Sequence, residues 1–278
     1  MVSILLCYYG VISRSIRYTH ESIKKNILDI LKEKYNVDVY VFNFNIEDNL
    51  IDGYKVEYSD INYINYNYYE EEKQNEFDKE INEKYNDILN QIFYYKQYYN
   101  NVVNSINALK QLYTEYKVGC FIEKNKNNYD IVIATCSDNY FCNKFNLEDI
   151  DDCIENKNVI YITPMNDAGG YTNAFYYGNT DKIIILLKRF SFIIENKCFL
   201  HRDYEFYVKF IMDIYNIERR YSNLYYFKIK NNKNIFWNNN NYNYNFFKLI
   251  LNDKTYNYDD LNLKYNELKK ELESENQS

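Results

Sequence analysis

The beginning of the chain combines apolar runs with an amphipathic segment. The almost continuously apolar run Val2–Tyr8 ends at Gly10, which is typical of a buried strand in a parallel sheet. Apolar residues recur at helical spacing over Ile23–Leu31, and Thr19 is the expected N-cap of that helix. The run Val37–Phe42 indicates a second strand. Strand, helix and strand in this order predict a βαβ unit.

Further elements follow from the same two periodicities. Residues 44–80 are polar and acidic, and we expect an excursion there with a short strand at 55–58. Residues 129–135 are the most apolar later run and are expected at the centre of a sheet, whereas Thr180 and Asp181 should cap a helix. The other expected strands are 158–163 and 224–229, and the expected helices are 81–92, 102–116, 180–195, 202–215 and 261–272.

These elements predict an α/β fold with a Rossmann-like, mostly parallel sheet flanked by helices. Residues 1–230 are expected to form one domain, with a helical insertion at about 60–117. Residues 231–278 are expected to be an Asn- and Tyr-rich loop and a C-terminal helix that packs on the same domain.

Composition excludes several classes of protein. The chain has 35 Tyr in 278 residues, and its excess of Tyr, Asn, Ile and Lys is typical of an A+T-rich genome, such as that of a large DNA virus or a protist. The net charge of −7 argues against a protein that wraps duplex nucleic acid. No stretch is apolar enough for a transmembrane helix, and the beginning of the chain lacks the basic region of a signal peptide.

The six cysteines do not have the spacing of metal ligands. No Cys-x-x-Cys occurs and the chain has only two His, so the sequence does not predict a zinc site. We expect free and mostly buried thiols, and a location in reducing cytoplasm, which for a viral protein is that of the host.

Arginines follow the first predicted strand, at a place where open α/β sheets bind ligands. Arg14 and Arg17 lie shortly after Gly10 and just before a helix, and arginines beside a helix N-terminus suit a diphosphate. The alternative is that both are surface residues paired with nearby acids.

A carboxylate follows the central strand at the same expected edge of the sheet. Asp138, flanked by Ser137 and Asn139, could hold a divalent cation or a ribose hydroxyl. The alternative is an aspartate that stabilises a turn or caps a helix.

Glycine and proline gather in the segment 164–175, after the strand 158–163. Pro164 is the only proline of the chain, and the nearby glycines indicate a backbone that only glycine adopts readily. Asp167 could orient an acceptor hydroxyl or act as a general base. The alternative is a structural loop with a turn aspartate. The other polar residues of this loop are Asn166, Thr172 and Asn173.

The order of these motifs resembles a family of GT-A-like glycosyltransferases found in bacterial surface-polysaccharide clusters and in large DNA viruses. Its members show a strand with a Gly-x-x-x-Arg-like turn, a helix, a Val-Asp-Val-type strand, a Tyr-Asp-type strand leading to an aspartate, and a loop containing Gly and Asn. The matching segments are Tyr9–Arg14, Glu21–Leu28, Val37–Phe44, Tyr129–Asn139 and Gly170–Gly178, so the resemblance covers roughly residues 2–230.

The resemblance implies transfer of a sugar from a nucleotide-sugar donor to a hydroxyl of a glycan or another acceptor. Our hypothesis assigns catalysis to one loop aspartate and donor binding to the loops that follow the strands. The roles are catalysis by Asp167; donor binding by Gly10, Arg14, Arg17, Asp138, Asn166 and Asn173; and coordination of Mg²⁺ or Mn²⁺ by Asp138.

Two departures from the family pattern motivate other classes of function. Cys136 and Ser137 stand where the family has an arginine before its aspartate, and Ala174 replaces the aspartate of the later Asn-Asp pair. The main alternative is therefore an inactive GT-A-like domain that binds nucleotide sugars or carbohydrate, or serves as a scaffold. A structural particle protein, the third class, would not respond to nucleotides.

Overall fold

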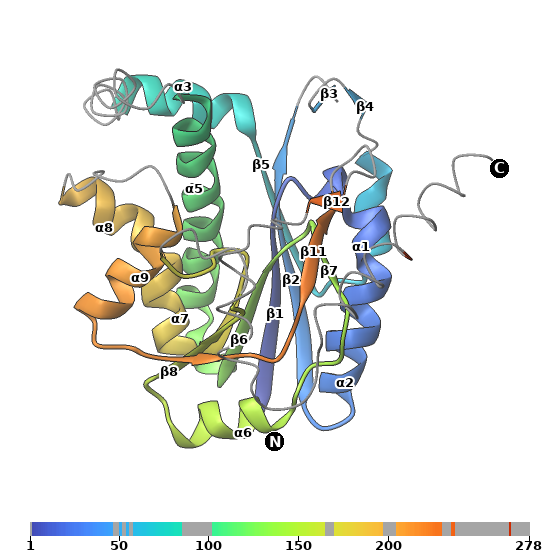
Figure 1. Ribbon diagram of the computed structural model, residues 1–278. Coiled ribbons are helices and arrows are strands. Elements are labelled where there is room, and N and C mark those ends of the chain that lie inside the picture. Colours follow the sequence, from blue (N-terminus) through green and yellow to red (C-terminus); the bar gives the residue numbers. More distant parts are fainter. Residues whose placement is uncertain are drawn as a thin grey trace.

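The computed structural model describes residues 2–46, 50–51, 54–55, 58–84, 102–164, 170–196, 204–229, 235–236 and 267. Within these residues the protein is an α/β fold in which helices flank a twisted, mostly parallel sheet (Figure 1). No helix in these ranges is long and apolar enough to cross a membrane.

The main sheet has seven strands in the described ranges, in the order β10-β8-β9-β6-β1-β2-β5. Neighbouring strands are parallel, except that β9 is antiparallel to both β6 and β8. The predicted mostly parallel sheet is therefore confirmed. Its strands are β1 (Ser3–Gly10), β2 (Asn36–Asn45), β5 (Tyr68–Lys73), β6 (Ile131–Cys136), β8 (Val159–Ile162), β9 (Phe175–Asn179) and β10 (Glu218–Tyr221).

The two most apolar runs of the sequence form the centre of this sheet. In β1, Leu6 pairs in register with Val39 of β2 on one side and Ile133 of β6 on the other. Strands buried on both faces need apolar residues at every position, which is why these runs do not alternate with polar residues. The βαβ unit predicted at the beginning of the chain is confirmed by the parallel pairing of β1 and β2.

Helices cover both faces of the sheet. In Figure 1, α1 and α2 lie on one side, and α5, α7, α8 and α9 lie on the other. A π-helical turn at Lys24–Leu28 joins α1 to α2. The helices are α1 (Ile16–Ile23), α2 (Asp29–Lys32), α3 (Gln74–Lys84), α5 (Val102–Lys124), α6 (Glu148–Glu155), α7 (Thr180–Leu187), α8 (Arg189–Glu195) and α9 (Tyr204–Ile214).

The N-cap predicted at Thr19 is wrong. The helix α1 begins at Ile16, so Thr19 lies inside it and is fully buried. Its Oγ1 donates a hydrogen bond to the backbone oxygen of Ser137 at 2.6 Å. Thr19 therefore ties α1 to the turn after β6, a tertiary contact that local sequence spacing does not reveal.

The acidic segment expected to be an excursion contains the edge strand β5, which pairs with β2. The region 60–117 therefore contributes a strand to the sheet as well as helices. An edge position leaves one side of the strand in water, so carboxylates are tolerated there. Tyrosine hydroxyls bind these carboxylates: Tyr40 donates to Glu70 (3.2 Å), Tyr69 to Glu71 (2.5 Å) and Tyr113 to Glu72 (2.7 Å).

The sequence pattern does not predict β9, although this strand separates β6 from β8. Its last residue, Asn179, is the N-cap of α7, because its side chain accepts a hydrogen bond from the backbone N–H of Asp181 at 3.2 Å. The cap expected at Thr180 and Asp181 is thus one residue earlier. The helix expected over 180–195 is divided into α7 and α8 around Lys188.

A smaller antiparallel sheet lies beside α1 and has the order β12-β11-β7. Its strands are β7 (Asn139–Phe141), β11 (Tyr226–Ile229) and β12 (Ile235–Phe236). The strand expected at 224–229 is therefore confirmed. The strand expected at 55–58 shares only Lys55 with β4 (Tyr54–Lys55), which forms a short hairpin with β3 (Leu50–Ile51), and a 3-10 helix (Tyr58–Tyr63) begins at its last residue. Most of 85–92, 231–245 and 261–272 lies outside the described residues.

One buried carboxylate beside the main sheet gives a pH-dependent prediction. Asp149 in α6 accepts hydrogen bonds from the Tyr177 hydroxyl (2.5 Å) and from Asn146 Nδ2 (3.0 Å). Burial raises the pKa of Asp149 to about 6. The folded protein then binds more protons than the unfolded chain between about pH 4 and pH 6, so this group should lower stability by roughly 1–3 kcal/mol as the pH rises through that window.

Urea unfolding of the wild type and of Asp149→Asn at pH 5 and pH 7.5 measures this effect. The stability of the wild type relative to the variant should be lower at pH 7.5. Asp151→Asn is the matched control, because Asp151 is on the same helix but hydrogen bonds from Lys34 and Tyr35 lower its pKa. The difference in unfolding free energy between Asp151→Asn and the wild type should be the same at both pH values. A difference that is also unchanged for Asp149→Asn would contradict the prediction.

Candidate functional site

The end of β1 and the turn after β6 lie side by side at the carboxyl edge of the sheet. Tyr9 pairs in register with Cys136, and the backbone N–H of Ser137 lies 3.4 Å from the oxygen of Tyr9. From β1, the sheet is extended through β2 and β5 in one direction and through β6 in the other. Ligands bind at such a change of direction in open α/β sheets.

Gly10 ends β1 with a φ of +108°, a conformation that L-residues with a side chain rarely adopt. A Cβ at this position would meet no atom within 4 Å. Glycine is therefore required here by the backbone conformation and not by crowding, and it turns the chain toward Arg14.

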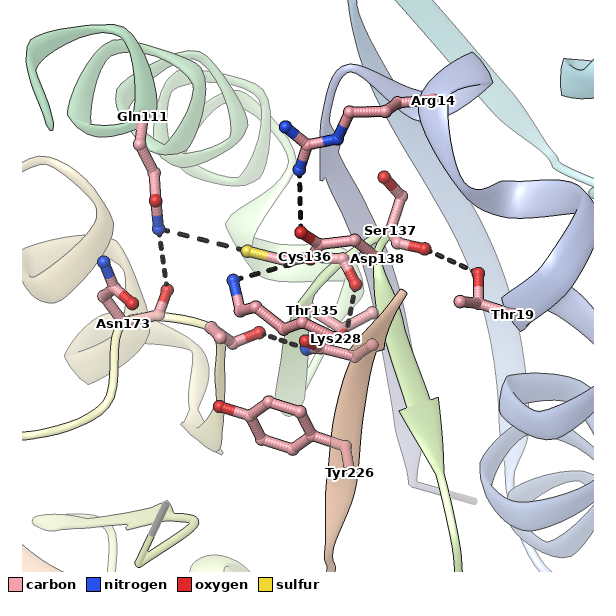
Figure 2. Close-up of polar contacts among 12 residues, drawn as sticks. Arg14, Thr19, Gln111, Thr135, Cys136, Ser137, Asp138, Asn173, Tyr226 and Lys228 are labelled. Carbon is pink, nitrogen blue, oxygen red and sulfur yellow. Dashed lines mark hydrogen bonds and ion pairs between the residues drawn. The ribbon is translucent and has the colours of Figure 1, made fainter. Parts of the chain in front are cut away.

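Arg14 and Lys228 both approach the carboxylate of Asp138 (Figure 2). Arg14 Nη2 lies 2.7 Å from Asp138 Oδ2, and Lys228 Nζ lies 3.5 Å from Asp138 Oδ1. Arg14 comes from the 3-10 turn Ile12–Arg14, and Lys228 comes from β11 of the small sheet. Residues that are far apart in the sequence thus form one charged cluster, which we call the Asp138 cluster (Arg14, Asp138 and Lys228).

The backbone around Asp138 is fixed from two sides. Its carbonyl oxygen accepts a hydrogen bond from the Ile229 N–H at 2.9 Å, and the neighbouring Ser137 oxygen accepts from Thr19. This hydrogen bond ties β11 to the turn. Because Lys228 is the residue before Ile229, the bond also holds Lys228 close to Asp138.

Opposite charges keep the cluster ionised despite its burial. Burial alone would raise the pKa of Asp138, but the charges of Lys228 and Arg14 outweigh burial and hold that pKa below its usual value. Burial alone would lower the pKa of Lys228, but the charge of Asp138 outweighs it and raises that pKa above its usual value. With two cations and one carboxylate, the cluster has one net positive charge at neutral pH.

A second group of polar contacts fixes the loop before β9 against the same edge. The backbone oxygen of Asn173 accepts from the Tyr9 hydroxyl at 2.8 Å and from Gln111 Nε2 at 3.2 Å. Gln111 Nε2 also contacts Cys136 Sγ (Figure 2), at a distance of 3.9 Å. The side-chain Nδ2 of Asn173 is buried and has no hydrogen-bond partner within the described part of the chain, so a donor is left for a ligand.

Cys136 is not a nucleophile in this arrangement. Burial raises the pKa of its thiol to about 12, so it is neutral at physiological pH. It serves as a small buried residue, as expected from the sequence.

Gln111 also connects the edge to a buried ion pair beneath it. Its Nε2 lies 3.2 Å from Glu115 Oε1, and Glu115 Oε2 pairs with Arg189 Nη1 at 2.6 Å. Both charged side chains have no exposed surface. Glu115 also accepts from the Tyr176 hydroxyl, so this buried ion pair joins α5, α8 and β9.

The surroundings of Asp138 do not fit a divalent metal. Mg²⁺ and Mn²⁺ favour several oxygen ligands, and within the described ranges no group of three or more His, Cys, Asp or Glu side chains is placed to hold a metal ion. In the Asp138 cluster, each carboxylate oxygen already faces a cation. A metal there would lie beside two positive charges.

The structure brings together some of the residues that the sequence singled out. Gly10, Arg14, Asp138 and Asn173 lie at the same edge of the sheet. Arg17 instead forms an ion pair with Asp60 at 2.7 Å. Asn166 and Asp167 lie outside the described residues.

Sequence reasoning missed Lys228 and Gln111. Lys228 is the single charged residue in the otherwise apolar strand β11, and a lone charge in such a strand was a usable signal. Gln111 is one of several polar residues on α5, and nothing in the sequence distinguishes it.

The chain matches no protein-family model, and no curated protein is significantly similar to it. Function must therefore be argued from the geometry of the site, because open α/β sheets support many different chemistries.

Proposed function

We propose that the protein is a glycosyltransferase that moves a sugar from a nucleotide-sugar donor to an acceptor hydroxyl. The observation that carries this proposal is the Asp138 cluster, a group with a buried carboxylate, two partly exposed cations and a net positive charge at the carboxyl ends of β1 and β6. Nucleotides bind at this place in open α/β sheets, and a diphosphate is an anion that such a cluster attracts.

The reaction needs positive charge where the leaving group forms. The bond between the anomeric carbon and the diphosphate oxygen breaks, and its electron pair stays on the diphosphate. The acceptor oxygen bonds to the anomeric carbon and loses its proton to a base. Fixed cations beside the diphosphate stabilise the developing charge, and we assign this role to Arg14 and Lys228, which both approach Asp138. The candidate base is Asp167, which the polar residues of the glycine-rich loop suggested in the sequence.

A second candidate is a domain that binds nucleotide sugars without transferring them. Ala174, at the position of the family's loop aspartate, has no exposed surface, and its backbone oxygen accepts a hydrogen bond from Asn139 Nδ2 at 2.8 Å. A carboxylate is therefore missing, and the position faces the interior of the protein. This observation favours binding without catalysis.

A thermal-shift screen with UDP- and GDP-sugars tests the proposal, followed by detection of released nucleoside diphosphate in the presence of mixed acceptors. One donor should raise the melting temperature, because a ligand at 100 times its Kd adds about 2.7 kcal/mol to stability. The corresponding nucleoside monophosphate should stabilise less, because it offers fewer phosphate oxygens to the cations. Stabilisation without release would support the second candidate, and no stabilisation by any donor would reject both.

A further inference from the structure

Two cations share one carboxylate in the Asp138 cluster, and each approaches a different oxygen. Arg14 Nη2 is within hydrogen-bond distance of Oδ2, whereas the 3.5 Å between Lys228 Nζ and Oδ1 is too long for a good hydrogen bond. Oδ1 has no hydrogen-bond partner among the residues described. The carboxylate thus holds both cations, one of them loosely.

Both cations keep donors for a ligand. A guanidinium has five N–H groups, and the hydrogen bond from Arg14 to Asp138 uses Nη2, so other N–H groups of Arg14 remain for a ligand. The side chains of Arg14 and Lys228 are 29% and 23% exposed, against 8% for Asp138. An anion from solvent can therefore reach the cations more readily than a metal ion can reach the carboxylate.

The position of Lys228 is fixed by backbone pairing. Lys228 pairs in register with Asn139 across β11 and β7, and Asn139 directly follows Asp138. The flexible side chain can then move from the carboxylate toward a ligand without any shift of the strand.

We infer that Arg14 and Lys228 bind the donor diphosphate directly, without a divalent metal, and that Asp138 is a positioning residue that holds these two cations. The inference rests on the proposed function, because it concerns the diphosphate of that donor. It replaces the metal-ligand role that the sequence suggested for Asp138.

Asp138 distinguishes this arrangement from a metal site. If Asp138 holds a metal, Asp138→Asn should abolish binding. If it only positions the cations, the substitution removes one negative charge and raises the net charge of the cluster. Diphosphate affinity should then be retained or increased, even though the variant loses stability.

Isothermal titration of the full chain with UDP, and separately with inorganic pyrophosphate, tests the inference in EDTA and in Mn²⁺. We expect binding in EDTA, and Mn²⁺ should change the affinity of UDP less than about threefold, because the cations already supply the charge. Lys228→Met and Arg14→Met should each lower the affinity for UDP by about tenfold or more, because each substitution removes a charge-assisted hydrogen bond to the diphosphate. Lys228→Arg should keep most of the affinity.

Lys32→Met is the matched control, because Lys32 is an exposed lysine of α2, just before the amino end of β2, and its loss changes the net charge equally. Its UDP affinity should equal that of the wild type. Circular dichroism identifies variants that do not fold, in which case Lys228→Gln replaces Lys228→Met.

The outcomes separate the inference from the proposed function. UDP binding that requires Mn²⁺ and is lost in folded Asp138→Asn would overturn the inference and leave the glycosyltransferase proposal standing. Metal-free pyrophosphate binding that needs Lys228, without a response to any nucleotide sugar, would support the cation pair and reject the proposed function. Binding of neither UDP nor pyrophosphate would overturn both.

Discussion

Replacing Glu115 with alanine is expected to lower the free energy of unfolding by about 3–5 kcal/mol, because the substitution leaves a buried charge without its partner. Glu115 and Arg189 are both without exposed surface, and their ion pair is 2.6 Å long. Burial disfavours the charge of Arg189, and the charge of Glu115 outweighs it and raises the pKa of Arg189. The guanidinium would therefore stay charged in an apolar interior.

Urea unfolding measures this loss, and Glu123→Ala is the matched control. Glu123 is on the same helix α5 and pairs with Lys188 at 2.7 Å, but both side chains are partly exposed. Exposed ion pairs contribute about 0–1 kcal/mol, so this variant should be close to wild type. Equal losses in the two variants would contradict the prediction.

A double variant tests the reason for the loss. Glu115→Met with Arg189→Met removes both charges and should recover much of the stability, because apolar residues of similar volume often replace a buried ion pair without cost. A double variant as unstable as Glu115→Ala would show that the loss comes from packing and not from the uncompensated charge.

Replacing Gly170 with alanine should lower the stability by about 3 kcal/mol, at the upper end of the cost of overpacking. A Cβ at Gly170 would lie 2.0 Å from the backbone oxygen of Glu205 and 2.4 Å from the nitrogen of Phe206. Backbone atoms cannot move aside as a side chain does. The loop before β9 would have to separate from α9 and would lose the hydrogen bond from the Tyr171 N–H to the Glu205 oxygen.

Thermal unfolding checks this prediction, with Gly119→Ala as the control. The nearest atoms to a Cβ at Gly119 are side-chain carbons of Lys188 and Leu187, at 2.8 and 3.1 Å, and alanine also favours the helix α5. Gly119→Ala should therefore lose less stability. If Gly170→Ala unfolds at the same temperature as the wild type, the prediction is wrong, and the close approach of the α9 backbone to Gly170 does not contribute to stability.

The glycine-rich loop shows how far local sequence reasoning reaches. The concentration of Gly and Pro after β8 correctly marks positions that need glycine. The expected reason, a backbone conformation that favours glycine, is wrong at Gly170 and Gly178, because Gly10 is the one described glycine with a positive φ. The sequence does not give the cause at Gly170, which is the approach of α9, an element that follows later in the chain. Asp167 of the same loop stays a prediction, because it lies outside the described residues.

The strands also divide into those that the sequence predicts and one that depends on tertiary contacts. Apolar runs predict β1, β2, β6 and β8, because strands covered on both faces need apolar residues at nearly every position. The edge strand β5 is missed, because its pattern is acidic and its carboxylates are stabilised by tyrosines from other elements. Strand propensity depends on neighbours that the local sequence does not contain.

Tyrosine use changes the interpretation of the composition. The excess of Tyr remains typical of an A+T-rich genome, yet many of these hydroxyls have a structural task. They donate to carboxylates that are largely or fully removed from water, as Tyr177 does to Asp149 and Tyr176 to Glu115. A hydrogen bond of this kind offsets part of the cost of burying a carboxylate.

The sequence by itself determined the α/β class, the central strands and the places of Arg14 and Asp138 after two of those strands. These features follow from local periodicity and from where ligands bind in open sheets. Only the tertiary structure decided what Asp138 contacts. It brings Lys228 from β11, far along the chain, to the same carboxylate, so that Asp138 lies between two cations. The physical reason is that charge acts through space, and the distances between charges are set by the pairing of strands that are distant in sequence.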